Sequence, residues 1–88
     1  MFGENSSTLT NEGTITGDKF STVGMAGKAS VVTNKKTITL NAKNSTGIFG
    51  EANSTLLNDT TGNITVKEES SVGIYSKGNN KLAENKGI

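Results

Sequence analysis

One short motif returns along the chain at nearly constant spacing. Residues 10–16 read TNEGTIT, and residues 33–39 read TNKKTIT, 23 residues further on. A related stretch, NDTTGNIT, lies at residues 58–65, and ENKGI at residues 84–88 resembles the start of a fourth copy. A period of about 20 to 30 residues is typical of solenoid proteins, in which each copy forms one coil of a stack.

Two further motifs keep the same period, which supports a division into coils. They are MFGE, GMAGK, GIFGE and GIYSK at residues 1–4, 24–28, 47–51 and 73–77, and STLTN, SVVTN and STLLN at residues 7–11, 30–34 and 54–58. We therefore predict a single β-solenoid segment over residues 1–88, with about four coils of 23–26 residues. The expected coils are about 1–21, 22–45, 46–71 and 72–88, the last of them incomplete.

The residue pattern within each copy predicts three short strands and no helix. TITL at residues 37–40 and NITV at residues 63–66 alternate polar and apolar side chains, which is the period of a strand with one buried face. The same alternation predicts that Val72 and Ile74 share one face of a strand. Stacked coils of this kind form an all-β fold, the parallel β-helix, in which each coil depends on its neighbours because it cannot bury enough apolar surface alone.

Equivalent residues of successive coils should lie about 4.8 Å apart along a common axis. Three columns of apolar side chains then form the core. These columns are Met1, Met25, Ile48 and Ile74; Ile15, Ile38, Ile64 and Ile88; and Leu9, Val32, Leu57 and Leu82. On the other face of the first strand we expect a column of Phe2, Ala26, Phe49 and Tyr75. It is either a surface that contacts sugar or protein, or an aromatic stripe that covers the coil or points inward.

An asparagine recurs at one turn of every coil, at Asn11, Asn34, Asn58 and Asn85. Asparagine suits left-handed turn positions, so exposed turn residues are one interpretation. The other is an amide ladder along the axis, like the asparagine ladders of cross-β assemblies. The sequence leaves both interpretations open.

Two columns of charged residues alternate in sign from coil to coil. One is Glu12, Lys35, Asp59 and Lys86, and the other is Glu4, Lys28, Glu51 and Lys77. Opposite charges attract at strand spacing and like charges repel, so a slip of one coil would be unfavourable in both columns. The alternation therefore indicates control of the register. Because an exposed pair contributes only about 0 to 1 kcal/mol, ordinary surface charge is the alternative.

Composition excludes several classes of site. The 88 residues include nine lysines and eight acids but no arginine, cysteine or histidine. This composition excludes disulfides, zinc sites and histidine-based catalysis, and it argues against nucleic-acid binding. We expect no cofactor, no metal site and no catalytic residue. The adjacent acids Glu68 and Glu69 should point to opposite sides of a strand, and no apolar run is long enough to span a membrane.

The units GIFGEANSTLLNDTTGNITV and GIYSKGNNKLAENKGI, at residues 47–66 and 73–88, resemble the passenger repeats of fusobacterial-type autotransporter adhesins. The resemblance covers the chain through the recurring patterns G-[IM]-[FYA]-[GS]-[EK] and N-x-G-x-I. It implies a right-handed parallel β-helix that is exported and held at the cell surface by a C-terminal outer-membrane barrel. The shafts of that family carry adhesive regions that bind host cells or other bacteria.

These observations favour a non-catalytic shaft segment of a bacterial cell-surface adhesin, excised from a longer chain, that presents or spaces adhesive regions. Its expected partners are adjacent repeats of the same or a like chain and, through the parent protein, a ligand on a host-cell or bacterial surface. We expect the segment to bind no nucleic acid and to insert into no membrane. One alternative is a self-assembling extracellular filament, because head-to-tail stacking would continue the motifs at both ends. A polysaccharide-acting enzyme would need clustered carboxylates with Arg or Lys, and arginine is absent.

Overall fold

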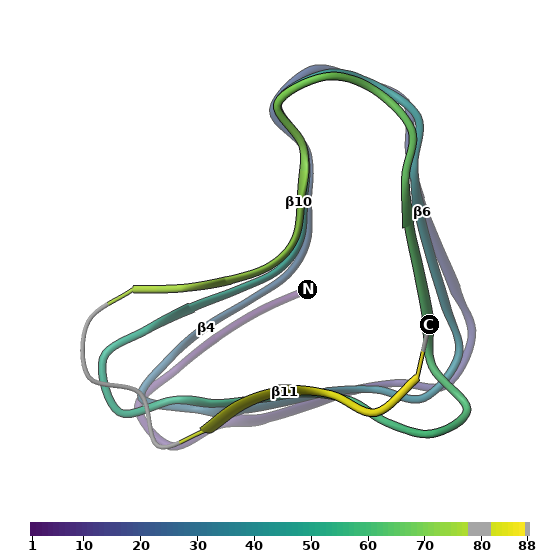
Figure 1. Ribbon diagram of the computed structural model, residues 1–88. Helices are drawn as coiled ribbons and strands as arrows, with labels where there is room; N and C mark the ends of the chain where they lie inside the picture. Colours follow the sequence, from purple (N-terminus) through teal and green to yellow (C-terminus); the bar gives the residue numbers. More distant parts are fainter. Residues whose placement is uncertain (78–81, 88) are drawn as a thin grey trace.

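In the computed structural model, which describes residues 1–77 and 82–87, the strands pair in parallel with the equivalent strands of neighbouring coils (Figure 1). Three sheets result, one on each side of the coil. Sheet A contains β1 (Phe2–Glu4), β4 (Val23–Lys28), β7 (Thr46–Glu51) and β10 (Val72–Ser76); sheet B contains β2 (Thr8–Asn11), β5 (Val31–Asn34), β8 (Thr55–Asn58) and β11 (Leu82–Asn85); sheet C contains β3 (Thr14–Gly17), β6 (Thr37–Leu40) and β9 (Asn63–Val66). The predicted all-β solenoid with three strands per coil is confirmed.

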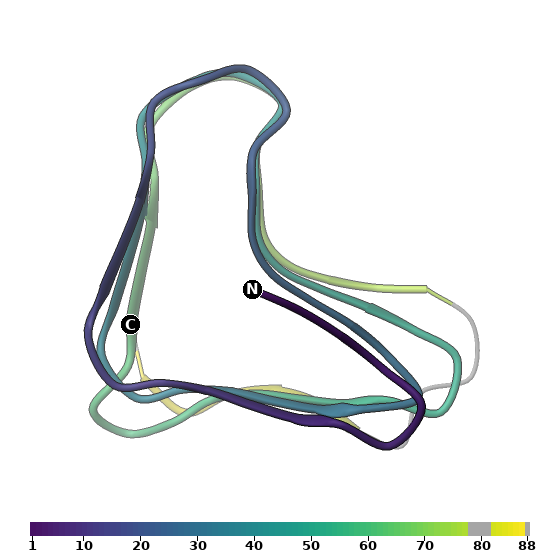
Figure 2. The same cartoon turned by 180° about the vertical axis from the view of Figure 1, so that it is seen from behind.

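The coil is right-handed. In Figure 1, which looks along the stack from its C-terminal side, the chain runs counter-clockwise as it advances toward the viewer, and Figure 2 shows the same path from behind. This is the hand that parallel crossover connections almost always take, because strands of L-amino acids twist to the right. The described residues form no helix, and so none that is long and apolar enough to cross a membrane.

The core occupies the interior of the coils and is built from one or two columns per sheet. Its fully buried side chains are Met25 and Ile48 from sheet A, Val32 and Leu56 from sheet B, and Ile38 and Leu40 from sheet C. The strand registers stack Met25, Ile48 and Ile74 in one column and Ile15, Ile38 and Ile64 in another, as expected. Met1 is 51% exposed, and Ile88 lies outside the described residues.

The expected third column was wrong from the third coil on. The register places Leu9 beside Val32, and Val32 beside Leu56 rather than Leu57. Leu57 pairs with Thr33 and Glu84 instead, and Leu82 pairs with Thr55. Side chains alternate along a strand, so the residue two before each turn asparagine faces the same way as that asparagine, whereas Leu57 comes immediately before Asn58 and faces outward.

The expectation that Val72 and Ile74 share a face was also wrong, because sheet A bends. Val72 is 41% exposed while Ile74 packs against the core. In β4, a middle strand of the same sheet, the adjacent residues Gly24 and Met25 are both buried. A Cβ at Gly24 would lie 2.7 Å from the carbonyl oxygen of Gly47, so only glycine lets the strands turn inward together at this point.

Replacing Ile38 by Asp should abolish the fold, because it buries an unpaired carboxylate in a column where the native side chain has no solvent exposure. Circular dichroism should show loss of the β-rich spectrum. The matched control is Thr16→Asp on the same sheet, where the exposed side chain stacks beside Thr39. A variant Ile38→Asp with the native spectrum and melting temperature would mean that the sheet C column is not core.

Candidate functional site

The asparagine ladder runs through the corner between sheets B and C. The Nδ2 amide of Asn11 donates to Oδ1 of Asn34 at 2.8 Å, that of Asn34 donates to Oδ1 of Asn58 at 2.9 Å, and that of Asn58 donates to Oδ1 of Asn85 at 2.7 Å. Asn34 and Asn58 have no solvent exposure, and Asn11 has 6%. Of the two interpretations of these residues, the structure shows the amide ladder, which is buried at Asn11, Asn34 and Asn58 and exposed at Asn85.

Each ladder amide also serves its own turn. Nδ2 of Asn34 also donates a hydrogen bond to the carbonyl of Lys36 at 2.9 Å. Oδ1 of Asn11 accepts a hydrogen bond from the backbone N–H of Gly13 at 3.2 Å. The side chains therefore satisfy turn backbone groups that no strand can reach, and through the separate bonds of the ladder they tie one coil to the next.

Hydroxyl side chains fill the other two corners, which the sequence reasoning missed. Between sheets A and B, Ser7, Ser30 and Ser54 each donate to a carbonyl at the end of the preceding strand, at 2.6–2.9 Å. Between sheets C and A, Oγ of Ser45 donates to the carbonyl of Ala42 at 3.0 Å, and Oγ of Ser71 accepts the backbone N–H of Ser45 at 3.2 Å. The available signal was a serine or threonine just before the first and second strand of each copy, at Ser7, Thr22, Ser30, Ser45, Ser54 and Ser71.

The two charged columns stack as expected, and within the described residues Glu4, Lys28 and Glu51 form no ion pair within 4.0 Å. Glu4 lies beside Lys28 and Lys28 beside Glu51 in the register of sheet A. Lys35, Asp59 and Lys86 follow Glu12 at the turn after the asparagine ladder, each bonded through its backbone N–H to the coil before it. Lys77 likewise donates its backbone N–H to the carbonyl of Gly50, next to Glu51.

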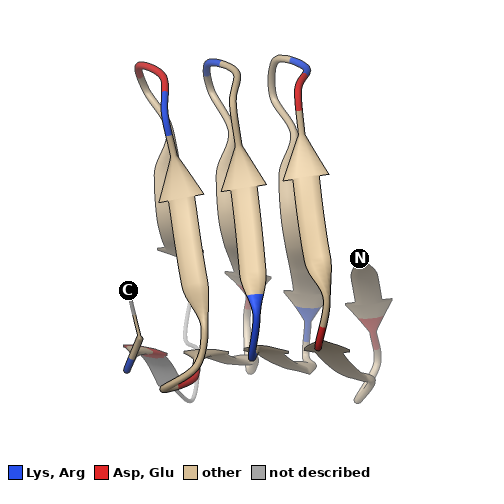
Figure 3. Cartoon of the chain, turned by 90° about the vertical axis from the view of Figure 1, so that its right-hand side faces the viewer, with Lys and Arg blue, Asp and Glu red and all other residues tan. Residues whose placement is uncertain are grey.

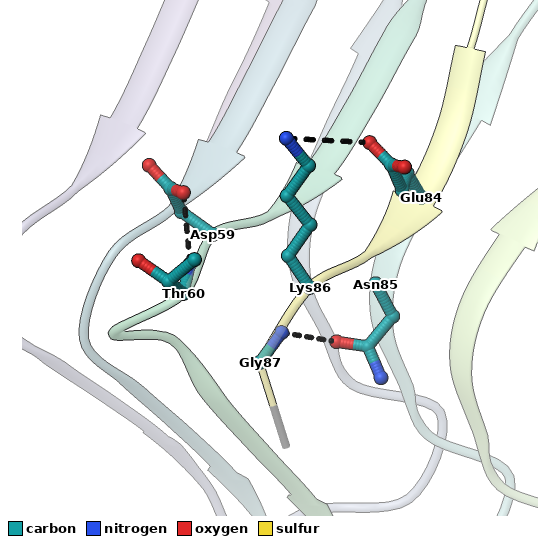
Figure 4. Close-up of polar contacts among 6 residues, drawn as sticks. All are labelled: Asp59, Thr60, Glu84, Asn85, Lys86 and Gly87. Atoms are coloured by element: carbon teal, nitrogen blue, oxygen red, sulfur yellow. Dashed lines mark hydrogen bonds and ion pairs between the residues drawn. The ribbon is translucent and has the colours of Figure 1, made fainter.

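One ion pair joins Lys86 to Glu84 of the same coil, at 3.9 Å (Figure 4). Both side chains are about half exposed. The charges lie in turns and loops and in strands of sheets A and B, while the strands of sheet C carry none (Figure 3). Glu68 and Glu69 lie in the loop between β9 and β10, so the expectation that they sit on a strand was wrong.

The predicted aromatic column lies on the outer face of sheet A. The register stacks Phe2 beside Ala26, Ala26 beside Phe49, and Phe49 beside Tyr75. The rings of Phe49 and Tyr75 are tilted by 56° with centroids 5.2 Å apart, which is a favourable aromatic contact. Because Ala26 is small, the surface is hollowed between Phe2 and Phe49, and this hollow is lined further by Glu4, Gly27, Lys28 and Glu51.

No cluster of three or more acidic side chains that could hold a metal ion occurs in the described part of the chain. The candidate site consists of two sets of repeated groups. Inside are the polar ladders at the corners, which hold the coils in register. Outside are the charged columns and the aromatic column, which are presented to whatever contacts the molecule.

Residues 1–62 match a family model described as BigA third pectate lyase-like domain. The match spans the first two coils and most of the third. The chain belongs to this family. No curated protein and no solved structure matches the chain. Membership agrees with the stacked parallel strands, and the fusobacterial type of the expected resemblance stays a prediction.

Replacing Asn34 by Ala should lower the free energy of unfolding by about 1–3 kcal/mol, because the amide of Asn11 loses an acceptor and Oδ1 of Asn58 loses a donor inside the protein. For a chain of this size, each kcal/mol lowers the melting temperature by about 4–8 °C. Asn63→Ala is the control, because Asn63 is exposed and outside the ladder. Equal melting temperatures for the two variants would mean that the ladder does not stabilise the fold.

Proposed function

We propose that the chain is a non-catalytic shaft segment of a bacterial cell-surface adhesin, which spaces or presents adhesive regions located elsewhere in a parent protein. The observation that carries the proposal is the uniform stack. The coils repeat one set of core, corner and charge positions, so no coil is specialised as a reaction centre. Repetition of one unit along an axis builds length and stiffness.

Family membership supports this role because a β-helical domain of a surface protein fits a structural part. The autotransporter route, anchoring through a parent barrel, and a host-cell or bacterial ligand of the parent are further parts of the proposal. They rest on the resemblance of the repeats to adhesin passengers.

A spacer should not adhere by itself. Beads coated with the 88-residue chain should capture no more epithelial cells or bacteria than beads coated with the Ile38→Asp variant, which we expect to be unfolded. Capture by the folded chain alone, at several times the control level, would contradict the spacer role and assign adhesion to this segment.

The family description includes the words pectate lyase-like, so catalysis needs its own test. We expect no release of unsaturated products from polygalacturonate, with or without added calcium, because lyase chemistry needs a base and a charge-stabilising cation held together at the substrate. Here Glu4, Lys28 and Glu51 lie at successive coil levels with no carboxylate-ammonium contact within 4.0 Å. Turnover that is lost in Glu51→Gln would overturn this part of the proposal.

The alternative function is a head-to-tail filament. It is favoured by the charged columns, since Lys77 and Lys86 would stand next to Glu4 and Glu12 of a second copy stacked on the C-terminal side. Against it, sheets A and B have four described strands and sheet C has three, so flush stacking would leave one strand position vacant. Long fibres in electron micrographs of the purified chain would favour the filament over the shaft.

A further inference from the structure

Sheet A exposes apolar side chains on both sides of its bend. Val23 and Val72 precede the bend and are 43% and 41% exposed, and Phe2 and Tyr75 follow it and are 64% and 46% exposed. Figure 1 shows that the two arms of the sheet meet at an angle that opens away from the core. We call this outer surface, formed by Val23, Val72 and the column of Phe2, Ala26, Phe49 and Tyr75, the bend face. Apolar groups gathered on one exposed face mark a contact surface.

The charged column Glu4, Lys28, Glu51 and Lys77 runs along the margin of the bend face. Within the described residues, no ion pair within 4.0 Å engages Glu4, Lys28 or Glu51. The sign reverses at every coil, about 4.8 Å apart. An α-helix repeats every 5.4 Å and an extended peptide about every 6.7 Å on one face, so both drift out of step. A partner that matches the whole column needs strands stacked at the same spacing.

We propose that the bend face pairs with the bend face of a second copy of this chain that runs in the opposite direction. Reversing the column brings each acid opposite a lysine: Glu4 faces the partner's Lys77, and Lys28 faces the partner's Glu51. A parallel copy at the same level would place like charges opposite each other, which is unfavourable. The arrangement is two-fold symmetric and self-complementary, as closed dimer interfaces are.

The aromatic column selects the same register independently. In the reversed copy, the partner's Phe49 lies opposite Ala26, where the surface is hollowed between Phe2 and Phe49. The same two-fold axis lies along the strands, so each arm of the bend face meets the equivalent arm of the partner, rings toward rings and valines toward valines.

Sedimentation of the 88-residue chain over a dilution series should show a monomer–dimer equilibrium. Phe49→Ser should raise the dissociation constant at least about tenfold, because the ring that fills the hollow is lost. Phe20→Ser is the matched control: Phe20 is 72% exposed but lies outside the bend face, so its loss should leave the equilibrium unchanged. Circular dichroism of each variant verifies that the fold is kept.

Charge reversal tests the direction of pairing. Lys28→Glu places like charges opposite each other twice in the dimer and should weaken it at least about tenfold. Adding Glu51→Lys in the same chain restores opposite pairs between antiparallel copies, although it spoils the alternation within each copy. Association should therefore recover in the double variant. Lys35→Glu, on the other charged column, should have no effect.

Cysteine pairing gives a second measure of direction, since the chain has no cysteine of its own. A mixture of Lys28→Cys and Glu51→Cys should form the mixed disulfide faster than either variant links to itself. End-to-end stacking would not bring these positions together. A chain that stays monomeric at the highest concentration, or a dimer that ignores Phe49→Ser and Lys28→Glu, would overturn the proposal.

Discussion

The hydrogen bonding between coils sets the rest of the structure. Backbone N–H groups of each coil, at turns as well as in strands, donate to carbonyls one coil away, as from Lys35 to Asn11 and from Asp59 to Asn34, both at 2.9 Å. One such register fixes where every side chain stands relative to its equivalents. The apolar columns, the amide ladder and the charged columns are consequences of that single alignment, and a slip would misplace all of them together.

The sides and the corners of the coil solve different problems. On the sides, the backbone N–H and C=O groups are paired within the sheets. The inward side chains there are aliphatic, such as Val32 and Ile38. At the corners the backbone turns, and its N–H and C=O groups there cannot pair within the sheets. Small polar side chains hydrogen-bond to these groups inside the protein. The turns also require left-handed backbone. At one equivalent position in three successive coils, φ is 54° at Asn5, 51° at Ala29 and 67° at Asn53. Of these residues, asparagine adopts the left-handed conformation at a lower free-energy cost than alanine.

The repeat period and the alternation of side chains along a strand explain what the sequence could and could not predict. The period fixed the number of strands per coil and the stacking of Asn34 on Asn58, because equivalent positions in a solenoid share a column. The Leu57 error came from aligning the third copy by residue type instead of counting back from the asparagine. The Val72 error came from a bend that breaks the alternation at a column of glycines, which a pattern of polar and apolar residues does not encode. The burial of the amide ladder depends on the coil cross-section, which no single copy of the motif contains.

Fold and role separate cleanly in such a stack, because inward positions determine the architecture and outward positions determine what the molecule does. A pectate lyase-like scaffold does not by itself imply cleavage of polysaccharide. In this chain Glu4, Lys28 and Glu51 succeed one another at constant spacing along an edge. Exposed charges that form no ion pair between coils contribute little to the stability of their own chain. In the proposed dimer, their regular alternation favours a second copy with the same repeat and disfavours one that is out of step.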